Sequence, residues 1–168
     1  MDAATVRLVA VEDEDFGWLG LSDARRNGLT TPPGGAENAE TLQVLRNIHE
    51  RLSAAGCRGS WMIVAGREVV GLIGFRRPPN ADGEVEIGYG IAESRRGRGF
   101  ATAAVAALLR ACECDPSITS VVAETSVANP ASQRALISNG FTRGANRHDA
   151  DDGDVIQWRR NTKSVGGR

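Results

Sequence analysis

Three arginines and two glycines, in the run Arg95-Arg96-Gly97-Arg98-Gly99, have the composition of an anion-binding turn. The run follows strict alternation from Glu84 to Ile91, which predicts a strand. It precedes an apolar stretch without helix breakers, Ala101 to Leu109, which predicts a helix. A glycine-rich turn that opens a helix leaves backbone N–H groups unpaired at the positive end of the helix dipole. The sequence therefore predicts a phosphate or pyrophosphate site at this turn.

The spacing of the glycines excludes two common phosphate-binding motifs. A dinucleotide-binding fingerprint needs glycines in first, third and sixth place, but Gly97 and Gly99 are followed by Thr102. The Gly-Lys-Ser/Thr ending of a P-loop is absent. Two other interpretations stay open: a nucleotide-binding protein that uses the same turn, and a surface turn with solvated arginines.

The spacing Arg96-x-x-Gly99-x-Ala101 resembles the acyl-CoA signature of the GNAT superfamily of N-acetyltransferases, Gln/Arg-x-x-Gly-x-Gly/Ala. In that superfamily the backbone amides of the loop hold the CoA pyrophosphate. The resemblance therefore implies acetyl-CoA as co-substrate, with no metal ion. The cofactor-binding residues that it implies in the turn are Arg96, Gly97, Arg98, Gly99, Phe100, Ala101 and Thr102.

A second motif lies in the C-terminal half of the chain. Asn129-x-x-Ser132, followed by Asn139-Gly140-Phe141, resembles the pattern that closes the CoA site in the same superfamily. The resemblance implies that Asn129 orients the pantetheine arm and that Ser132 also contacts the cofactor. Together with the Glu-Ile-Gly-Tyr sequence that ends at Tyr89, these motifs are most similar to the branch that contains the ribosomal-protein N-terminal acetyltransferases.

The pantetheine arm of GNAT enzymes pairs with the end of the central strand, which implies main-chain partners at Tyr89 and Ile91. Such pairing requires the neighbouring strand to diverge from the central one. Gly88 and Gly90 are consistent with a bulge that produces this divergence, and close packing is the alternative explanation for them.

Acetyl transfer by direct attack of an amine needs a base for the amine and an acid for the departing thiolate. Alternation puts Glu86 on the same strand face as Gly88 and Gly90, with open space in front of its carboxylate. Several GNAT members use a glutamate on this strand, so Glu86 is the candidate base. The alternative is a carboxylate on a solvated strand face.

Ser132 is the candidate acid. Many GNAT enzymes place a tyrosine seven residues after the motif asparagine, where this chain has Leu136. The only tyrosine, Tyr89, belongs to the central strand, so the phenol-as-acid mechanism is not expected here. A serine that caps the first turn of a helix is the alternative role for Ser132.

The acceptor side carries no motif. We expect its pocket to come from residues 12–56 and from the acidic loop near 145–154, with Trp18 and Trp61 as candidate lining residues. A protein N-terminus and a small-molecule amine are both compatible with the sequence. A non-catalytic acyl-CoA-binding module and an acyltransferase for a longer acyl-CoA are the alternative functions. Homodimers are frequent among resembling proteins.

The elements that must position these residues follow from periodicity and breakers. In chain order we expect a strand at 5–11, helices at 15–25 and 36–55, strands at 60–65, 69–75 and 84–91, a helix from 101, a strand at 118–125, a helix at 130–138 and two closing strands, the last at 155–159. This order predicts an α/β (α+β) fold, with a mixed, mostly antiparallel sheet of six to seven strands and helices on both faces, as in GNAT proteins.

Composition limits the class of protein. The 168 residues are 41% hydrophobic and 24% charged with a net charge of −1, which provides no general attraction to nucleic acid or membranes. The chain has no apolar run long enough to span a bilayer and no basic N-terminal start, so we expect a cytoplasmic protein with its three cysteines reduced. We expect one domain over residues 1–162 and a disordered tail at 163–168.

Overall fold

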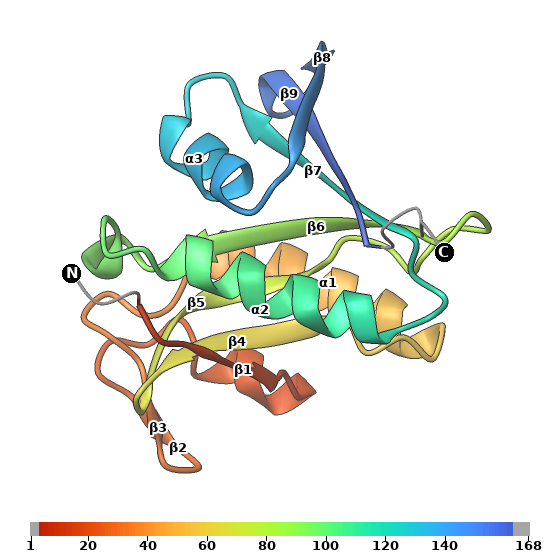
Figure 1. Cartoon of the computed structure of the whole chain (residues 1–168). Coiled ribbons are helices and arrows are strands. Elements are labelled where there is room, and N and C mark those ends of the chain that lie inside the picture. The colour runs from red at the N-terminus through yellow and green to blue at the C-terminus, as the bar shows by residue number, and fades with distance from the viewer. Residues whose placement is uncertain (1–3, 163–168) are drawn as a thin grey trace.

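The computed structural model describes residues 4–162, which form one nine-stranded sheet with helices on both faces (Figure 1). The α-helices are α1 (Ala39–Ala54), α2 (Phe100–Cys114) and α3 (Pro130–Ser138), and two short 3-10 helices are η1 (Asp13–Gly17) and η2 (Glu93–Arg95). The strands are β1 (Arg7–Ala10), β2 (Arg25–Arg26), β3 (Leu29–Thr30), β4 (Ser60–Ala65), β5 (Glu68–Phe75), β6 (Glu84–Ile91), β7 (Ser120–Ser126), β8 (Thr142–Asp149) and β9 (Gly153–Asn161).

Seven strands follow one another across the sheet in the order β1-β4-β5-β6-β7-β9-β8, and the short strands β2 and β3 lie off this path. All neighbours are antiparallel except β6 with β7 and β3 with β5. The predicted fold class, a mixed and mostly antiparallel sheet with helices on both faces, is confirmed.

The helices begin and end at residues with the local chemistry for it. Asn38 caps α1, because its side-chain oxygen accepts a hydrogen bond of 2.8 Å from Thr41 N. Asn129 caps α3 in the same way, and Pro130 occupies the first helical position. α2 starts directly after Gly99, which has a φ of +79°. Its first turn therefore has no capping side chain.

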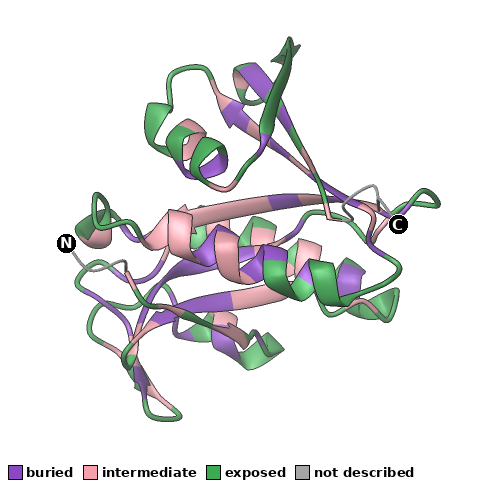
Figure 2. Ribbon diagram, in the orientation of Figure 1, coloured by how far each residue is buried: buried purple, intermediate pink, exposed green. Residues whose placement is uncertain are grey.

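Buried apolar residues form two clusters, the first built mainly with α2 but including Leu52 of α1, and the second including Leu42 of α1. Figure 2 shows the buried parts of the helices and strands. α2 contributes fully buried residues such as Val105 and Leu108 to one core. α1 contributes Leu42 to the other, where Leu72 of β5 is its partner in the cluster. The buried faces of α1 and α2 hold β6 and β7 in place, and the candidate site lies along these two strands.

The helix expected at residues 15–25 is wrong. The chain makes only the single 3-10 helix η1 there, and then turns into the β2–β3 hairpin. Buried Asp15 accepts a hydrogen bond from Glu12 N, which caps the start of η1, and another from Nε1 of Trp18, the residue directly after η1. Two glycines that follow weaken any continuation of a helix. The Asn27-Gly28 sequence, both residues at positive φ, forms the tight turn of the hairpin.

Among the described residues, no helix is long and apolar enough to cross a bilayer. The same residues contain no group of three or more histidine, cysteine or acidic side chains arranged to hold a metal ion. The expected disordered tail, residues 163–168, lies outside the described part of the chain. The single-domain boundary at residue 162 stays a prediction.

Candidate active site

The turn between η2 and α2 presents consecutive backbone N–H groups, from Gly97 to Thr102, that donate no hydrogen bond within residues 4–162. The first N–H bonded in this helix belongs to Ala103, which donates to Gly99 O at 3.1 Å. Gly97 and Gly99 both have positive φ, at +75° and +79°, which turns the amides toward the same side. Such a turn at the start of a helix is a ready site for a phosphate group.

The three arginines of the turn have different surroundings. Arg96 Nε donates to Ile91 O at 3.2 Å and so holds the turn against the end of β6. Arg95 forms an ion pair with Glu68 on β5. Arg98 is exposed and makes no ion pair or hydrogen bond with the described residues. Arg96 thus shapes the turn, and Arg98 leaves its charge available to a ligand.

A gap opens between β6 and β7 beside this turn. The two parallel strands are paired from Glu84 and Ser120 only as far as Ile87 and Ala123, although both strands continue. Beyond that point β6 keeps its pairing with β5, and β7 keeps its pairing with β9. The divergence expected from the sequence is therefore present. The expected bulge is not, because the β5–β6 register runs without interruption through Gly88 and Gly90.

The backbone of Tyr89 and Ile91 faces the gap. Arg76 N donates to Glu86 O and Ala92 N donates to Val70 O, both at 2.8 Å, so the even-numbered residues of β6 bond to β5. In an antiparallel pair the intervening residues point their N–H and C=O groups the other way. Tyr89 and Ile91 accordingly direct theirs toward β7, where the partner strand has diverged.

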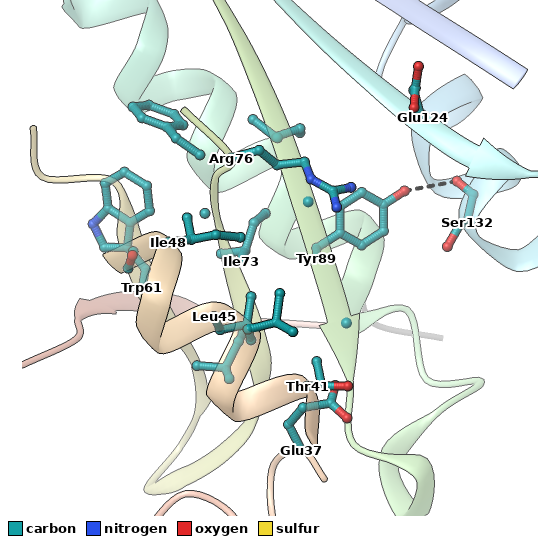
Figure 3. A pocket seen from close by; sticks show the side chains of 18 of the residues that line it. Glu37, Thr41, Leu45, Ile48, Trp61, Ile73, Arg76, Tyr89, Glu124 and Ser132 are labelled. Atoms are coloured by element: carbon teal, nitrogen blue, oxygen red, sulfur yellow. Dashed lines mark hydrogen bonds between the residues drawn. The ribbon is translucent and has the colours of Figure 1, made fainter. Parts of the chain in front are cut away.

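A cavity of about 370 Å³ occupies the gap and continues between α1 and the sheet (Figure 3). Trp61 and Phe75 form part of its apolar wall, with ring centroids 5.3 Å apart in an edge-to-face arrangement. Leu45 and Ile48 of α1 cover the same space from the helix side. Trp18, the other expected lining residue, is absent from the wall, because it is buried in the core on the α1 face.

Ser132 lies at the other end of the cavity, held by two neighbours. Asn129 Oδ1 accepts from Ser132 N at 3.2 Å, and Asn129 Nδ2 donates to Ser132 Oγ at 3.1 Å. Because its oxygen accepts that bond, the hydroxyl is free to donate its own proton into the cavity. The Tyr89 hydroxyl crosses the gap and donates to Ser132 O at 3.0 Å (Figure 3). Burial raises the pKa of Tyr89 to about 12.

Leu136 does not face this space. It is fully buried in the core on the α2 face. The position where many GNAT enzymes carry a tyrosine is therefore a packing position in this chain. The two histidines are also absent from the cavity lining: the His49 ring lies tilted against Phe16, and exposed His148 contacts Asp154 at 2.9 Å.

The carboxylates near the cavity differ in how far they are already paired. Glu86 lies outside the cavity lining and is bound by Arg77 at 2.7 Å and Arg76 at 3.9 Å. Glu124 lines the cavity, but Arg147 binds both of its oxygens at 2.7 Å, and these hydrogen bonds lower its pKa. Glu37 lines the cavity and has no ion-pair partner among residues 4–162.

A family model described as an acetyltransferase (GNAT) domain matches residues 5–142. The protein belongs to the GNAT acetyltransferase family. A ribosomal-protein-serine acetyltransferase of Escherichia coli K12 is 30% identical over 105 residues. That match covers 62% of this chain and 56% of the relative, so it spans only a little over half of the curated protein's length. It agrees with the GNAT branch indicated by the sequence motifs.

Solved structures share the fold of this GNAT chain. An acetyltransferase from Salmonella typhimurium, described as modifying the N-terminal serine of ribosomal protein L7/L12, has a TM-score of 0.68 at 21% identity, over 95% of this chain and 96% of that one. Mycobacterium smegmatis RimJ in complex with CoA-disulfide has a TM-score of 0.68 at 20% identity, over 93% and 81% of the two chains. At these identities the likeness establishes the fold.

Three charged residues of the cavity, Glu37, Arg76 and Glu124, were not named from the sequence. Glu37 and Arg76 carry no motif, and they reach the cavity only because α1 and the end of β5 flank the same part of β6. The sequence named residues 12–56 as a source of the acceptor wall, which agrees with the position of Glu37. The expected cofactor residues lie together at the turn and the gap, but Glu86 lies apart from them.

Proposed function

We propose that this GNAT protein transfers an acetyl group from acetyl-CoA to a primary amine by direct attack of the amine on the thioester. The observation that carries the proposal is the position of the unbonded amides of the turn, directly beside the gap where β6 and β7 diverge. A pyrophosphate on the turn places the pantetheine arm at the entrance of that gap. Family membership and the CoA complex of the M. smegmatis neighbour support this choice of co-substrate.

The backbone N–H groups from Gly97 to Thr102 hold the pyrophosphate, and Arg96 keeps the turn in shape. The pantetheine amides pair with the main chain of Tyr89 and Ile91, in the place that β7 vacates. A hydrogen-bonded extension of the sheet fixes the direction of the arm, so the thioester is delivered to the cavity.

Asn129 and Ser132 act at the thioester end. Asn129 fixes the Ser132 hydroxyl, which donates its proton to the departing CoA thiolate. Glu86, the base expected from the sequence, supports deprotonation of the amine poorly, since two arginines hold its carboxylate outside the cavity lining. Its role stays a prediction that the variants below test.

The acceptor is a primary amine with an apolar neighbouring group. Trp61, Phe75, Leu45 and Ile48 offer apolar surface, and acidic side chains flank it. A protein N-terminus, as named for the Salmonella neighbour, and a small-molecule amine both fit this description. The cytoplasmic location expected from composition, and a homodimer, stay predictions.

Thermal unfolding with acetyl-CoA, CoA, hexanoyl-CoA, ATP and NAD tests the co-substrate. A ligand at about a hundred times its Kd stabilises the folded state by about 2.7 kcal/mol, which is a readable rise in Tm. Acetyl-CoA and CoA are expected to raise Tm, and ATP and NAD are not. A Tm shift with a nucleotide alone would contradict the proposal.

Turnover is then measured as release of the CoA thiol with an N-terminal-serine peptide and with spermidine. Thiol release that depends on the amine is the expected result. Binding of acetyl-CoA without any release in the presence of either amine would favour a non-catalytic acyl-CoA-binding module. A higher kcat/KM with hexanoyl-CoA than with acetyl-CoA would assign a longer acyl donor.

A further inference from the structure

The Glu37 carboxylate is held in place through one of its oxygens, while its other oxygen has no hydrogen-bond partner within residues 4–162. Its Oε1 accepts hydrogen bonds of 2.9 Å from both Asn38 N and Asn38 Nδ2. Its Oε2 accepts none within residues 4–162. This second oxygen lies 3.2 Å from the point where a Cβ on Gly90 would be, so the carboxylate sits close against β6 and would have to shift by a few tenths of an ångström for a larger residue there. Figure 3 shows the side chain directed at the end of that strand.

The segment that carries Glu37 is anchored on both sides. Before it, Ala36 is fully buried and donates its N–H to Leu19 O at 2.7 Å. After it, Asn38 caps α1. A carboxylate at the start of a helix is also stabilised by the helix dipole. Glu37 is therefore held in one place, as a group that receives a cation should be.

Three other charged side chains of the described residues line the cavity, and none of them combines burial with a free carboxylate as Glu37 does. Glu124 on β7 is bound by Arg147, and Asp152, in the turn between β8 and β9, is exposed at the rim. Arg76, the residue directly after β5, lies over Gly88, with its side-chain carbons 3.8 Å from the point where a Cβ would be. Of the cavity's carboxylates, Glu37 is half-buried and unpaired within the described residues.

Glu37 and Ser132 lie on opposite sides of the gap. Along β6, Gly90 faces Glu37, whereas the adjacent Tyr89 reaches Ser132 on α3. Alternation directs these neighbouring residues to opposite faces of the sheet. A thioester in the gap thus has the Ser132 hydroxyl on one side and the Glu37 carboxylate on the other. An acid and a base on opposite sides of the reacting carbonyl suit transfer by direct attack.

We infer that Glu37 receives the ammonium group of the acceptor and acts as its base, an inference that rests on the proposed acetyl transfer. The ammonium gives one proton to Glu37, which releases it to water. The nitrogen lone pair then attacks the thioester carbon, so that a C–N bond forms and the C–S bond breaks. The second proton lost by nitrogen balances the one that the thiolate gains through the Ser132 hydroxyl.

The test compares Glu37→Gln with Glu40→Gln and Glu86→Gln. Glu40 lies in the first turn of α1 and outside the cavity lining, so its variant removes the same charge close by without touching the site. Thiol release is measured against pH with the N-terminal-serine peptide and with spermidine. Tm with and without acetyl-CoA is measured for each variant, to separate loss of folding or of cofactor binding from loss of the base.

Glu37→Gln is expected to lower kcat/KM about a hundredfold, and its remaining activity should rise with pH as the fraction of neutral amine rises. Its Tm shift with acetyl-CoA should match that of the unchanged protein, and Glu40→Gln should retain activity. Equal activity of Glu37→Gln and Glu40→Gln, or the same loss of activity and dependence on the neutral amine in Glu86→Gln alone, would overturn the inference. If the unchanged protein releases no thiol with either amine, the proposed function itself fails and Glu37 has no acceptor to receive.

Discussion

The turn from Gly97 to Thr102 offers a ligand backbone N–H groups from one short stretch of chain, whereas the wall around Glu37 offers side chains from several separate elements. The amides of the turn are directed by two glycines at positive φ and by the start of α2. The acceptor wall depends on how α1 packs against β5 and β6. A site built from the backbone of one short segment should therefore keep its geometry when distant residues are substituted. A site built from side chains of several elements depends on how those elements pack.

Among the variants proposed for this comparison, replacement of Ser132 should have the largest effect on activity. Ser132→Ala removes the hydroxyl proposed to protonate the thiolate, so kcat is expected to fall about a hundredfold. The Kd of acetyl-CoA should change little, because backbone groups hold the pyrophosphate. Timed assays of thiol release measure kcat, and calorimetric titration measures the Kd of acetyl-CoA. An unchanged kcat would leave Ser132 with a capping role alone.

Gly99→Val breaks the cofactor turn while leaving the acceptor wall intact. A β-branched residue is strained at a φ of +79°, so the turn must shift and the amides lose their common direction. We expect the Kd of acetyl-CoA to rise about ten- to hundredfold, equivalent to one or two charge-assisted hydrogen bonds.

Gly66→Val is the matched control for that change. Gly66 lies in the turn between β4 and β5 at a φ of +62°, with nothing within 4 Å of an added Cβ. Both variants should lose about 1–2 kcal/mol of stability from the strained backbone. Only Gly99→Val should weaken acetyl-CoA binding. Equal Kd values for the two variants would show that the turn does not hold the cofactor.

Leu136→Tyr tests whether the acid can be moved to its usual GNAT position. Because Leu136 is fully buried among core residues, a tyrosine there must overfill the core and bury its hydroxyl. We expect a loss of about 1–3 kcal/mol in the free energy of unfolding, measured by urea denaturation. In the Ser132→Ala background the added phenol should not restore kcat. Restored turnover would mean that α3 can rotate toward the gap.

Tyr89→Phe has the smallest expected effect, about 1 kcal/mol, because it removes one neutral hydrogen bond across the gap. Tyr89 is the single tyrosine, so ultraviolet absorbance of tyrosinate reports its ionisation alone. The folded protein should show that ionisation near pH 12, and the urea-unfolded protein near pH 10.

The raised pKa of Tyr89 also sets the direction of a stability change with pH. The folded state holds the proton more tightly than the unfolded state, so the contribution is complete below pH 10 and is lost as pH rises toward 12. Tyr89→Phe should lack this alkaline loss. Ionisation near pH 10 in the folded protein would show that the phenol is solvated and does not cross the gap.

Local chemistry made several elements predictable. The strand from Glu84 to Ile91 and the helix from Pro130 to Ser138 have the bounds expected from alternation and from an Asn-Pro start. The expected helix at 15–25 failed because the chain forms only η1 there, and Gly17 and Gly20 weaken any continuation of a helix. The Asn27-Gly28 sequence was a local signal for the β2–β3 hairpin, which the expected elements did not include.

The amino-acid sequence by itself determined the family, the glycine-rich turn before α2 and the Asn129–Ser132 pair, because each rests on residues a few positions apart whose geometry is set by the local backbone. Only the tertiary structure decided which carboxylate is available. Glu86 has open space on its own strand, yet two arginines from the neighbouring segment occupy it. Glu37 has no motif, yet helix packing brings it against Gly90. Charge pairing between distant segments depends on distances that exist only once the sheet and helices have packed.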